Sequence, residues 1–440
     1  MTDLNRLAAA MQALLTTTAD ELARDCGFVR RRRKVSGSNF AQTLVFAALA
    51  DPQPTENRLR NTAAAVGLDA SRQAIAKRLD DRAARFLRQL LATSVNQAVA
   101  SPVAIPLLRR FQSVVVLDSS VVALPAALAE TYRGGASRTT AGPTSAVKLT
   151  VGLDLVSGAL LGPDLSAGRA GDLAAPLAQA DPPPGGLHLA DLNYFSLEKF
   201  ARWGRAGAFW LSRLKCKTAV HDDRGHRLDL VARLRDAGEA DVDQDVVLGG
   251  GGCRVACRLI ARRVPAAVAA LRRLRLRDKS AERGDRVSLV ALALCDWTVL
   301  VTNVPREKLN VEEAVALARM RWQIELLFKL WKSGGGGVDR RRGAGTASAL
   351  CQLYSKLLAQ VVRHWVIVVG AWSMSDRSMT KAAEVVRMMA LSLAMALGSR
   401  SRLSAVLRHA RRLMEVGAHM ERRRKAPNAH DLILCLDSGP

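Results

Sequence analysis

The pattern of apolar and polar positions changes twice along the chain. Up to about residue 100, apolar residues recur with helical spacing, as in the Ala- and Leu-rich segment 1–25. From Phe111, short β-branched runs separated by turn residues replace that spacing and predict strands. From about residue 334 onward the pattern is helical again and rich in Lys and Arg. The chain therefore predicts a strand-rich centre between two helical regions.

The strand-rich centre has the order of a mixed sheet covered by helices. Expected strands lie at 112–118, 146–155, 157–165, 187–191 and 208–214. Three strands in a row, then a crossover, then alternating strand and helix is typical of the α/β class. Residues 216–306 break this order with strands that alternate around Cys253 to Val264, and they predict a β-rich insertion. The seven Cys are scattered, so we expect structural cysteines rather than disulfides or a zinc site.

The segment from Asn310 to Lys332 is the most strongly patterned helix. Asn310 and Glu313 have the spacing of a capping box, and Ser333 with four glycines ends the segment. On one helix, Arg321, Glu325 and Lys332 would fall within about 40° of one another, beside an apolar face. The acid among these cations is either a surface ion pair or a metal ligand close to a polyanion.

The charge of the chain indicates its partner. With 65 Lys and Arg against 40 Asp and Glu, the formal charge is +25. A phosphate backbone is the commonest partner of such a chain, and a membrane surface is the alternative. No apolar run reaches transmembrane length, and the N-terminus lacks the pattern of a signal peptide. We expect a soluble, cytoplasmic protein that binds nucleic acid.

The N-terminal region contains the first candidate for DNA contact. Five cations follow one another from Arg30 to Lys34, and segments 57–66 and 71–79 form a helix, a turn at Gly67 and a second helix. The arrangement is similar to a helix-turn-helix, although any helical hairpin with Gly at its turn has this pattern. In the second helix, the residues expected to face the bases are Arg72, Gln73 and Lys77.

Two further acids end expected strands. Asp118 and Asp191 each stand at the carboxyl end of an apolar run. Together with Glu325 they would form a set of hard oxygen ligands for two Mg²⁺ or Mn²⁺ ions, which can activate water or a 3′-hydroxyl for phosphodiester chemistry. Taken singly, each Asp is a common turn former at the end of a strand.

These motifs, in this order, resemble the Asp-Asp-Glu (DDE) transposases of the insertion-sequence-four family. That family has Tyr, Arg, Glu and Lys with spacers of two, three and six residues, and here Ala318, Arg321, Glu325 and Lys332 occupy those positions. The segments around Asp118, Asp191 and Trp297 match as well, and the resemblance spans roughly residues 111–356. Ala318 replaces the Tyr, so a hydroxyl that would contact phosphate is missing, whereas the acidic triad is intact.

The resemblance implies a ribonuclease-H-like α/β fold with flanking helical regions. The expected domains are a helical DNA-binding domain at 1–105, a catalytic domain at 106–370 interrupted by the insertion at 216–306, and a basic helical region at 371–440. The implied activity is metal-dependent transposition: cutting at the ends of an insertion sequence, formation of a hairpin and joining to target DNA.

The resemblance also implies roles for individual residues and partners. Arg321 and Lys332 would hold phosphates, and Trp297 would stack on a base flipped out of the hairpin, with help from Trp322; the alternative for both tryptophans is core packing. The partners would be the terminal inverted repeats, the target DNA and a second copy of the chain in the synaptic complex, on the bacterial nucleoid. A nuclease without strand transfer and an inactive DNA-binding regulator remain the rival interpretations.

Overall fold

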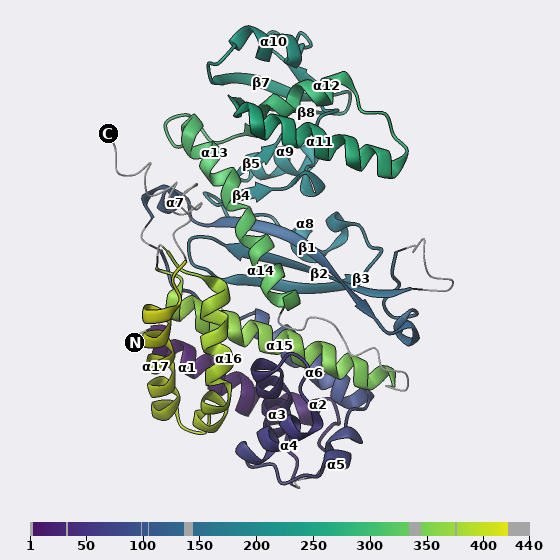
Figure 1. The fold of residues 1–440 in the computed structure, drawn as a ribbon, viewed down its shortest axis with the longest axis vertical. Coiled ribbons are helices and arrows are strands. Elements are labelled where there is room, and N and C mark those ends of the chain that lie inside the picture. Colours follow the sequence, from purple (N-terminus) through teal and green to yellow (C-terminus); the bar gives the residue numbers. More distant parts are fainter. Residues whose placement is uncertain are drawn as a thin grey trace. The chain divides into compact units, whose positions relative to one another are not determined.

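The computed structural model describes residues 3–31, 34–97, 99–103, 105–135, 144–333, 345–374 and 376–420 (Figure 1). The chain divides into two compact units. Of the described residues, unit 1 contains those within Met1–Ala104, Asp118–Ala178 and Gln323–Lys425, and unit 2 contains those within Ile105–Leu117 and Gln179–Trp322. The mixed α/β class predicted from the sequence is confirmed, whereas the predicted domain boundaries stay a prediction.

The N-terminal part of unit 1 is helical, as the sequence predicts. Its helices are α1 (Asp3–Ala13), a π-helical turn (Leu14–Thr18), α2 (Ala19–Asp25), α3 (Gly37–Ala50), α4 (Glu56–Ala65), α5 (Arg72–Ala76) and α6 (Asp81–Val95). Ser36, Thr55, Ser71 and Asp80 each accept a hydrogen bond from a backbone N–H in the first turn of the helix that follows. Such side chains satisfy donors that the helix itself leaves unpaired, which fixes where each helix begins.

The C-terminal part of unit 1 continues this helical layer. Its helices are α14 (Trp322–Ser333, in this unit from Gln323), α15 (Thr346–Ala371), α16 (Met379–Ala396) and α17 (Arg400–Gly417). The long helix α15 packs against α3, α6 and α17, so segments from both ends of the chain share one core (Figure 1). None of the described helices has both the length and the apolar character needed to span a bilayer.

Unit 1 also contains the strands on one side of β1 (Val114–Leu124), which passes from unit 2 into unit 1 after Leu117. The next strands are β2 (Ser145–Asp154) and β3 (Leu160–Ala167). They are antiparallel, with Val147 opposite Ala167, and the register shifts between Thr150 and Gly152. The predicted pair of strands at 146–165 is therefore present.

Unit 2 holds the other strands. From β1 outward their order is β4 (Leu187–Ala190), β5 (Phe209–Arg213), β9 (Trp297–Thr302), β8 (Cys253–Arg263), β7 (Val242–Gly250) and β6 (Val220–His221). β1, β4 and β5 are parallel, whereas β9, β8, β7 and β6 join by antiparallel pairs. The predicted insertion thus extends the sheet through the β5–β9 pair. The helices of this unit are α7 (Pro106–Arg109), α9 (Leu197–Arg205), α10 (Leu230–Ala237), α11 (Ala266–Arg283), α12 (Leu289–Ala293) and α13 (Val311–Met320).

Aromatic side chains form the core of unit 2. The rings of Phe200 and Trp210 stack with centroids 4.2 Å apart, and Trp203 packs against His188. Cys257 lies buried on β8, where burial raises the pKa of its thiol to about 12, and it is not part of a disulfide. This agrees with the structural role predicted for it.

Candidate active site

Asp118 does not end its strand, so that part of the sequence prediction is wrong. β1 continues for six residues beyond it to Leu124. The reason is the alternation of buried and exposed positions, in which Ser120, Val122 and Leu124 face the interior of unit 1. A strand that buries every second side chain is stabilised along its whole length. Asp118 is therefore a half-buried residue within a strand rather than a residue at its end.

Asp191 does follow its strand directly, as predicted. β4 ends at Ala190, and Asp191 precedes a single 3₁₀ turn that ends at Tyr194, whose N–H donates to the Asp191 carbonyl at 2.9 Å. Within unit 2, Nε of Arg321 lies 3.7 Å from Oδ1 of Asp191, and both side chains are largely buried. Two residues that the sequence singled out separately are therefore neighbours.

The helix predicted from Asn310 to Lys332 is divided in two, which corrects the sequence interpretation. Its start is as predicted, because Asn310 and Glu313 form the reciprocal capping box. At Arg321 the backbone keeps helical angles, but its N–H turns to the carbonyl of Arg319 instead of continuing the α-helical ladder. α13 therefore ends at Met320 and α14 starts at Trp322, so the angular argument for Arg321, Glu325 and Lys332 on one regular helix does not hold.

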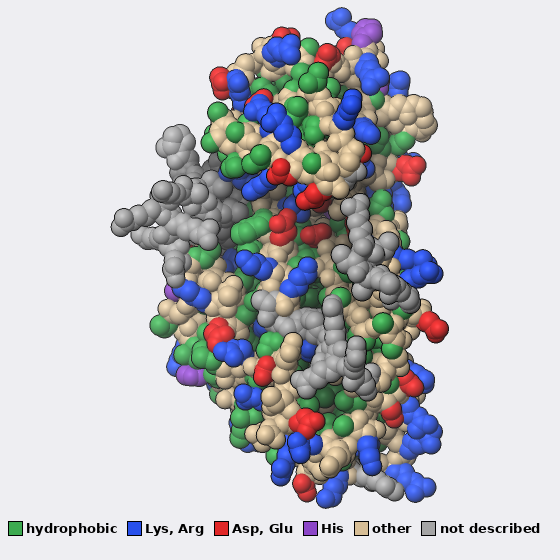
Figure 2. Space-filling view, turned by 45° about the vertical axis from the view of Figure 1, so that its right-hand side comes forward, with side chains coloured by type: hydrophobic (Ala, Val, Ile, Leu, Met, Phe, Trp, Pro, Cys, Tyr) green, Lys and Arg blue, Asp and Glu red, His purple; other side chains and the backbone are tan. Residues whose placement is uncertain are grey.

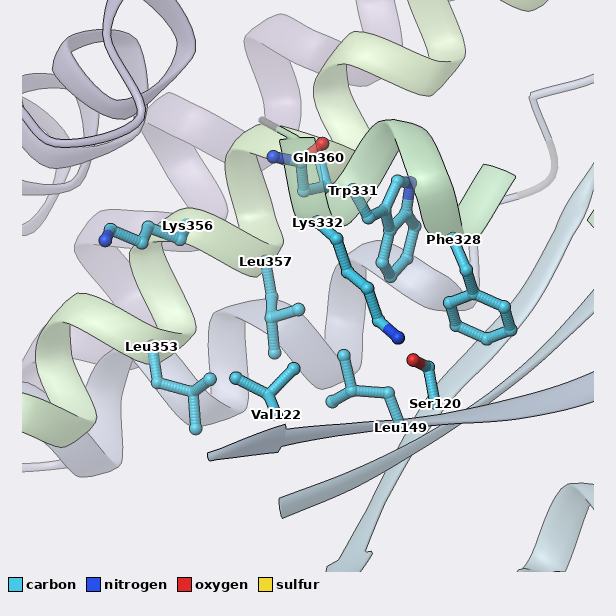
Figure 3. A pocket seen from close by; sticks show the side chains of 10 residues that line it. All are labelled: Ser120, Val122, Leu149, Phe328, Trp331, Lys332, Leu353, Lys356, Leu357 and Gln360. Atoms are coloured by element: carbon cyan, nitrogen blue, oxygen red, sulfur yellow. The ribbon is translucent and has the colours of Figure 1, made fainter. Parts of the chain in front are cut away.

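Glu325 and Lys332 both lie on α14, and both are exposed. Lys332 stands at the edge of a small cavity of unit 1, of about 10 Å³, and its ammonium group points toward the hydroxyl of Ser120 on β1 (Figure 3). Phe328 and Trp331 form the neighbouring wall with their rings at nearly right angles. This cavity has room for about one water molecule, so it is no substrate pocket.

The three acids of the predicted triad are distributed over both units. Asp118 and Glu325 belong to unit 1, whereas Asp191 belongs to unit 2. Among the residues that the structure describes, no three His, Cys, Asp or Glu side chains are grouped so that they could hold a metal ion. The convergence of the triad stays a prediction.

Behind Asp118, unit 1 contains a polar network that the sequence did not indicate. The backbone N–H of Ser119 donates to Oδ1 of Asp118 at 2.8 Å, and its hydroxyl donates to Oδ1 of Asp172 at 2.7 Å. Lys148 on β2 is buried and pairs with the same carboxylate at 2.8 Å. Burial alone would raise the pKa of Asp172. The hydrogen bonds from Lys148 and Ser119, together with the positive charge of Lys148, have the larger effect, so the pKa of Asp172 is lowered. No spacing rule connects these residues, because they meet only through the folding of the sheet.

The two candidate stacking residues differ in exposure. Trp297 opens β9 and is only 7% exposed, whereas Trp322 is 54% exposed at the start of α14. Trp297 nevertheless borders a cavity of about 320 Å³ inside unit 2. We call it the Trp297 cavity; its lining residues are Val231, Leu234, Arg235, Gly238, Arg263, Ala293, Leu294, Asp296 and Trp297. Trp297 is therefore packed in the core of unit 2 and also has a side that borders a cavity, so its burial does not exclude a stacking role.

The N-terminal candidates form a short, polar element. α5 carries Arg72 and Gln73, and Lys77 caps its C-terminus. Arg72 pairs with Glu56 of α4 at 2.7 Å, so the two predicted helices contact each other. α5 is shorter than the predicted 71–79, since after Lys77 the backbone N–H groups of Arg78 and Leu79 donate to carbonyls three residues back instead of four. Of the basic run, Arg32 and Arg33 lie outside the described residues. Elsewhere, Lys and Arg side chains are spread over the face in Figure 2 rather than gathered in one patch.

Comparison with known proteins identifies the family. Residues 109–362, more than half of the chain, match the family described as a transposase DDE domain. The chain is 28% identical over 362 residues to the transposase for insertion sequence element IS231F of Bacillus thuringiensis subsp. israelensis, covering 77% of this chain and 75% of that protein. It is 21% identical over 374 residues to the transposase for insertion sequence element IS1151 of Clostridium perfringens, covering 79% and 77%. The matched region contains Asp118, Asp191 and Glu325, and the chain belongs to the family of DDE transposases.

Proposed function

We propose that this protein cuts DNA at the two ends of an insertion sequence and joins the freed ends to target DNA. The observation that carries the proposal is the pair formed by Arg321 and Asp191. Arg321 is part of the signature that also contains Glu325, and within unit 2 it lies beside the second acidic motif. The carboxylate of Asp191 would bind the metal cations. The guanidinium beside it would donate hydrogen bonds to a DNA phosphate bound next to those cations.

Asp118, Asp191 and Glu325 would hold two Mg²⁺ or Mn²⁺ ions. Carboxylate oxygens are the ligands that these cations prefer, so the donor set fits. Within unit 2, Val116 of β1 pairs with Leu189 of the parallel strand β4, so the runs that precede the first two acids are neighbouring strands. Asp118 and Asp191 each follow two residues later. Such ions, when bound, favour deprotonation of water or a 3′-hydroxyl and stabilise charge on the leaving oxygen.

The reaction would proceed by successive displacements at phosphorus. Water forms a new P–O bond at the transposon end while the bond to the 3′-oxygen breaks, and that oxygen leaves as a 3′-hydroxyl. The freed 3′-hydroxyl then bonds to a phosphorus of the opposite strand while the bond from that phosphorus to the 3′-oxygen of the flanking DNA breaks, which closes a hairpin. A second water opens the hairpin by displacing the same transposon 3′-oxygen. The regenerated 3′-hydroxyl finally attacks a phosphorus of the target DNA and displaces a 3′-oxygen of the target strand. Arg321 and Lys332 would hold the phosphates on either side of the reacting bond, since cations stabilise the charge that develops on them.

The Trp297 cavity would accept the base that leaves the stack when the hairpin forms. Its volume of about 320 Å³ is within the range of small-molecule sites. The indole of Trp297 offers an aromatic face, and Arg235, Arg263 and Asp296 add charged groups to the wall. Trp322 would provide a second aromatic surface.

End recognition would belong to the N-terminal helices, with Arg72, Gln73 and Lys77 facing the bases and the run from Arg30 to Lys34 contacting phosphates. Because two ends must be processed together, we expect two copies of the chain in the synaptic complex. The reaction would take place on bacterial DNA in the cytoplasm.

The decisive experiment uses near-isosteric replacements of the triad. Purified Asp118→Asn, Asp191→Asn and Glu325→Gln should bind duplexes of the element's ends like wild type but leave them uncut in Mg²⁺. Glu307→Gln, which changes an exposed acid before α13, is the matched control and should cut normally. Cleavage by Glu325→Gln at a near wild-type rate would refute the proposal. Cleavage by wild type without any joining to target DNA would favour a nuclease.

A further inference from the structure

Within the described part of the chain, the start of β9 has a strand neighbour on one side only. On the β8 side, Trp297 forms the last pair of the ladder, opposite Arg263. On the β5 side, strand pairing covers only Leu300 to Thr302, with one further hydrogen bond from Leu214 N–H to the Val299 carbonyl. Strand ends without a neighbour fray most readily. The residue that opens β9 therefore needs another support if its ring is to keep one orientation.

Arg272 of α11 provides that support. Its Nη1 donates to the Trp297 carbonyl at 2.8 Å, and its Nη2 donates to Oγ1 of Thr298 at 3.1 Å. The planar fork of a guanidinium can hold two acceptors in a fixed geometry, which an ammonium group cannot do. Arg272 thus supplies the Trp297 carbonyl with the hydrogen-bond donor that a neighbouring strand would otherwise provide.

Arg273, the next residue of α11, holds the other side of Trp297. Its Nη2 lies 2.5 Å from both carboxylate oxygens of Asp296. Asp296 and Trp297 are adjacent, and both line the Trp297 cavity. Two consecutive arginines therefore fix two consecutive residues of the cavity wall, one through backbone and hydroxyl oxygens and one through a carboxylate.

The surroundings of Arg272 disfavour a positive charge at this position. Burial, followed by the nearby charges of Arg213 and Arg319, lowers the pKa of Arg272. A partly buried cation among like charges is unfavourable unless its hydrogen bonds compensate. Arg275, on the same helix, is exposed and provides a comparison.

We propose that Arg272 and Arg273 are positioning residues that hold Trp297 ready to receive the flipped base. The inference rests on the proposed function, and specifically on the stacking role of Trp297. If it holds, weakening this support slows the step that needs the stacked base and leaves the first nick unaffected.

The test separates nicking from hairpin formation in the full-length protein. Duplexes of the element's end, intact or already nicked, are incubated with wild type, Arg272→Lys, Arg272→Met, Arg273→Lys and the control Arg275→Met. We expect Arg272→Met to form hairpins about tenfold more slowly from nicked DNA, as loss of about 1.4 kcal/mol of stacking would require. Nicking of intact DNA should change less than about twofold, and the control should match wild type.

Thr298→Val provides a milder variant in case Arg272→Met folds poorly, because it removes one acceptor and keeps a β-branched side chain. It should slow hairpin formation in the same direction. 2-Aminopurine placed at each nucleotide flanking the nick should show weaker stacking, seen as higher fluorescence, in Arg272→Met than in wild type.

The outcomes distinguish this inference from the proposed function. Equal losses of nicking and hairpin formation, with a lowered thermal midpoint, would make Arg272 a structural residue only and overturn the inference. Unchanged hairpin formation in every Arg272 and Thr298 variant, while Trp297→Ala is defective, would overturn it as well. Normal hairpin formation by Trp297→Ala would instead refute the stacking role on which it rests.

Discussion

Arg321, three residues after Ala318 in the family signature, and Asp191 of the second acidic motif are neighbours, with Nε of the guanidinium 3.7 Å from Oδ1 of the carboxylate. About three quarters of each side chain is shielded from solvent, so this is not a typical surface ion pair. In the protein without metal, the guanidinium supplies positive charge beside an acid that is proposed to bind cations. The same group would be in place to hold a phosphate of the substrate.

Arg321→Ala is expected to affect cleavage and metal binding in opposite directions. Cleavage should fall about 10²-fold, the effect of losing one donor that stabilises developing charge. Mg²⁺ should raise the thermal midpoint of the variant more than that of wild type, because the carboxylate has lost its internal counter-charge. Arg321→Lys, which keeps the charge but not the fork, should be intermediate. Unchanged responses to Mg²⁺ would show that the pair has no part in the metal site.

Trp297→Ala is expected to accumulate nicked ends with few hairpins. Loss of an aromatic stacking partner costs about 1–3 kcal/mol per base, and the effect should appear only once a base leaves the stack. The buried position of Trp297 makes a second measurement necessary. A strongly lowered thermal midpoint with equal loss of nicking would favour core packing, whereas Trp297→Phe should retain most hairpin formation in either case.

Gln73→Ala is expected to reduce the preference for the element's ends over random DNA without weakening random binding. Replacing Arg30 and Arg31 by Ala should instead weaken both, and make binding less dependent on salt, because fewer counterions are released. Gel shifts at several salt concentrations measure both effects. Absence of any DNA binding by residues 1–100 in such an assay, with the fragment shown to be helical, would contradict the assignment.

Two buried histidines should make the protein less stable in mild acid. Burial lowers the pKa of both His188 and His364 to about 4, whereas an unfolded His titrates near 6.5. As the pH falls below 6.5, the unfolded state gains protons that the folded state does not, so the free energy of unfolding decreases. Each histidine should account for about 2 kcal/mol between pH 7.5 and pH 5.

His364→Gln tests this expectation for one site. The Nε2 of His364 contacts the Gly158 carbonyl at 2.7 Å, and a glutamine amide can donate to the same oxygen without titrating. Denaturant unfolding at both pH values should show a smaller acid loss for the variant than for wild type. An equal loss would mean that other groups dominate the acid response.

The sequence predicted those structural features that are determined by residues close to one another in the chain. The capping box of Asn310 and Glu313 and the turn between β2 and β3 formed as expected, because hydrogen bonds and turn chemistry within a few residues decide them. The break at Arg321 had no such signal. Its backbone angles stay helical, and only the direction of one N–H changes.

Other features of the candidate site depend on packing between residues far apart in the sequence, so the sequence did not predict them. Asp118 was expected to end its strand because an acid follows an apolar run, but the buried positions beyond it extend β1 to Leu124. Arg272 and Arg273 lie in a segment that the sequence predicted to be a basic helix. The composition of that segment did not indicate which acceptors their side chains would bind. Their acceptors, Trp297 and Asp296, lie more than twenty residues away and become neighbours only in the folded insertion.

Ala318→Tyr is expected to increase cleavage, because it restores the hydroxyl of the family signature. Ala318 is half-buried on α13, two residues before the helix ends and three before Arg321. A hydrogen bond to a charged group contributes about 1.5–3 kcal/mol, so a phosphate contact would raise the rate about 10- to 100-fold. Ala318→Phe adds the same ring without the hydroxyl and should leave cleavage unchanged or lower. Equal gains by Tyr and Phe would assign the effect to packing, and loss of activity in both, with a lowered thermal midpoint, would show that the helix has adapted to the smaller residue.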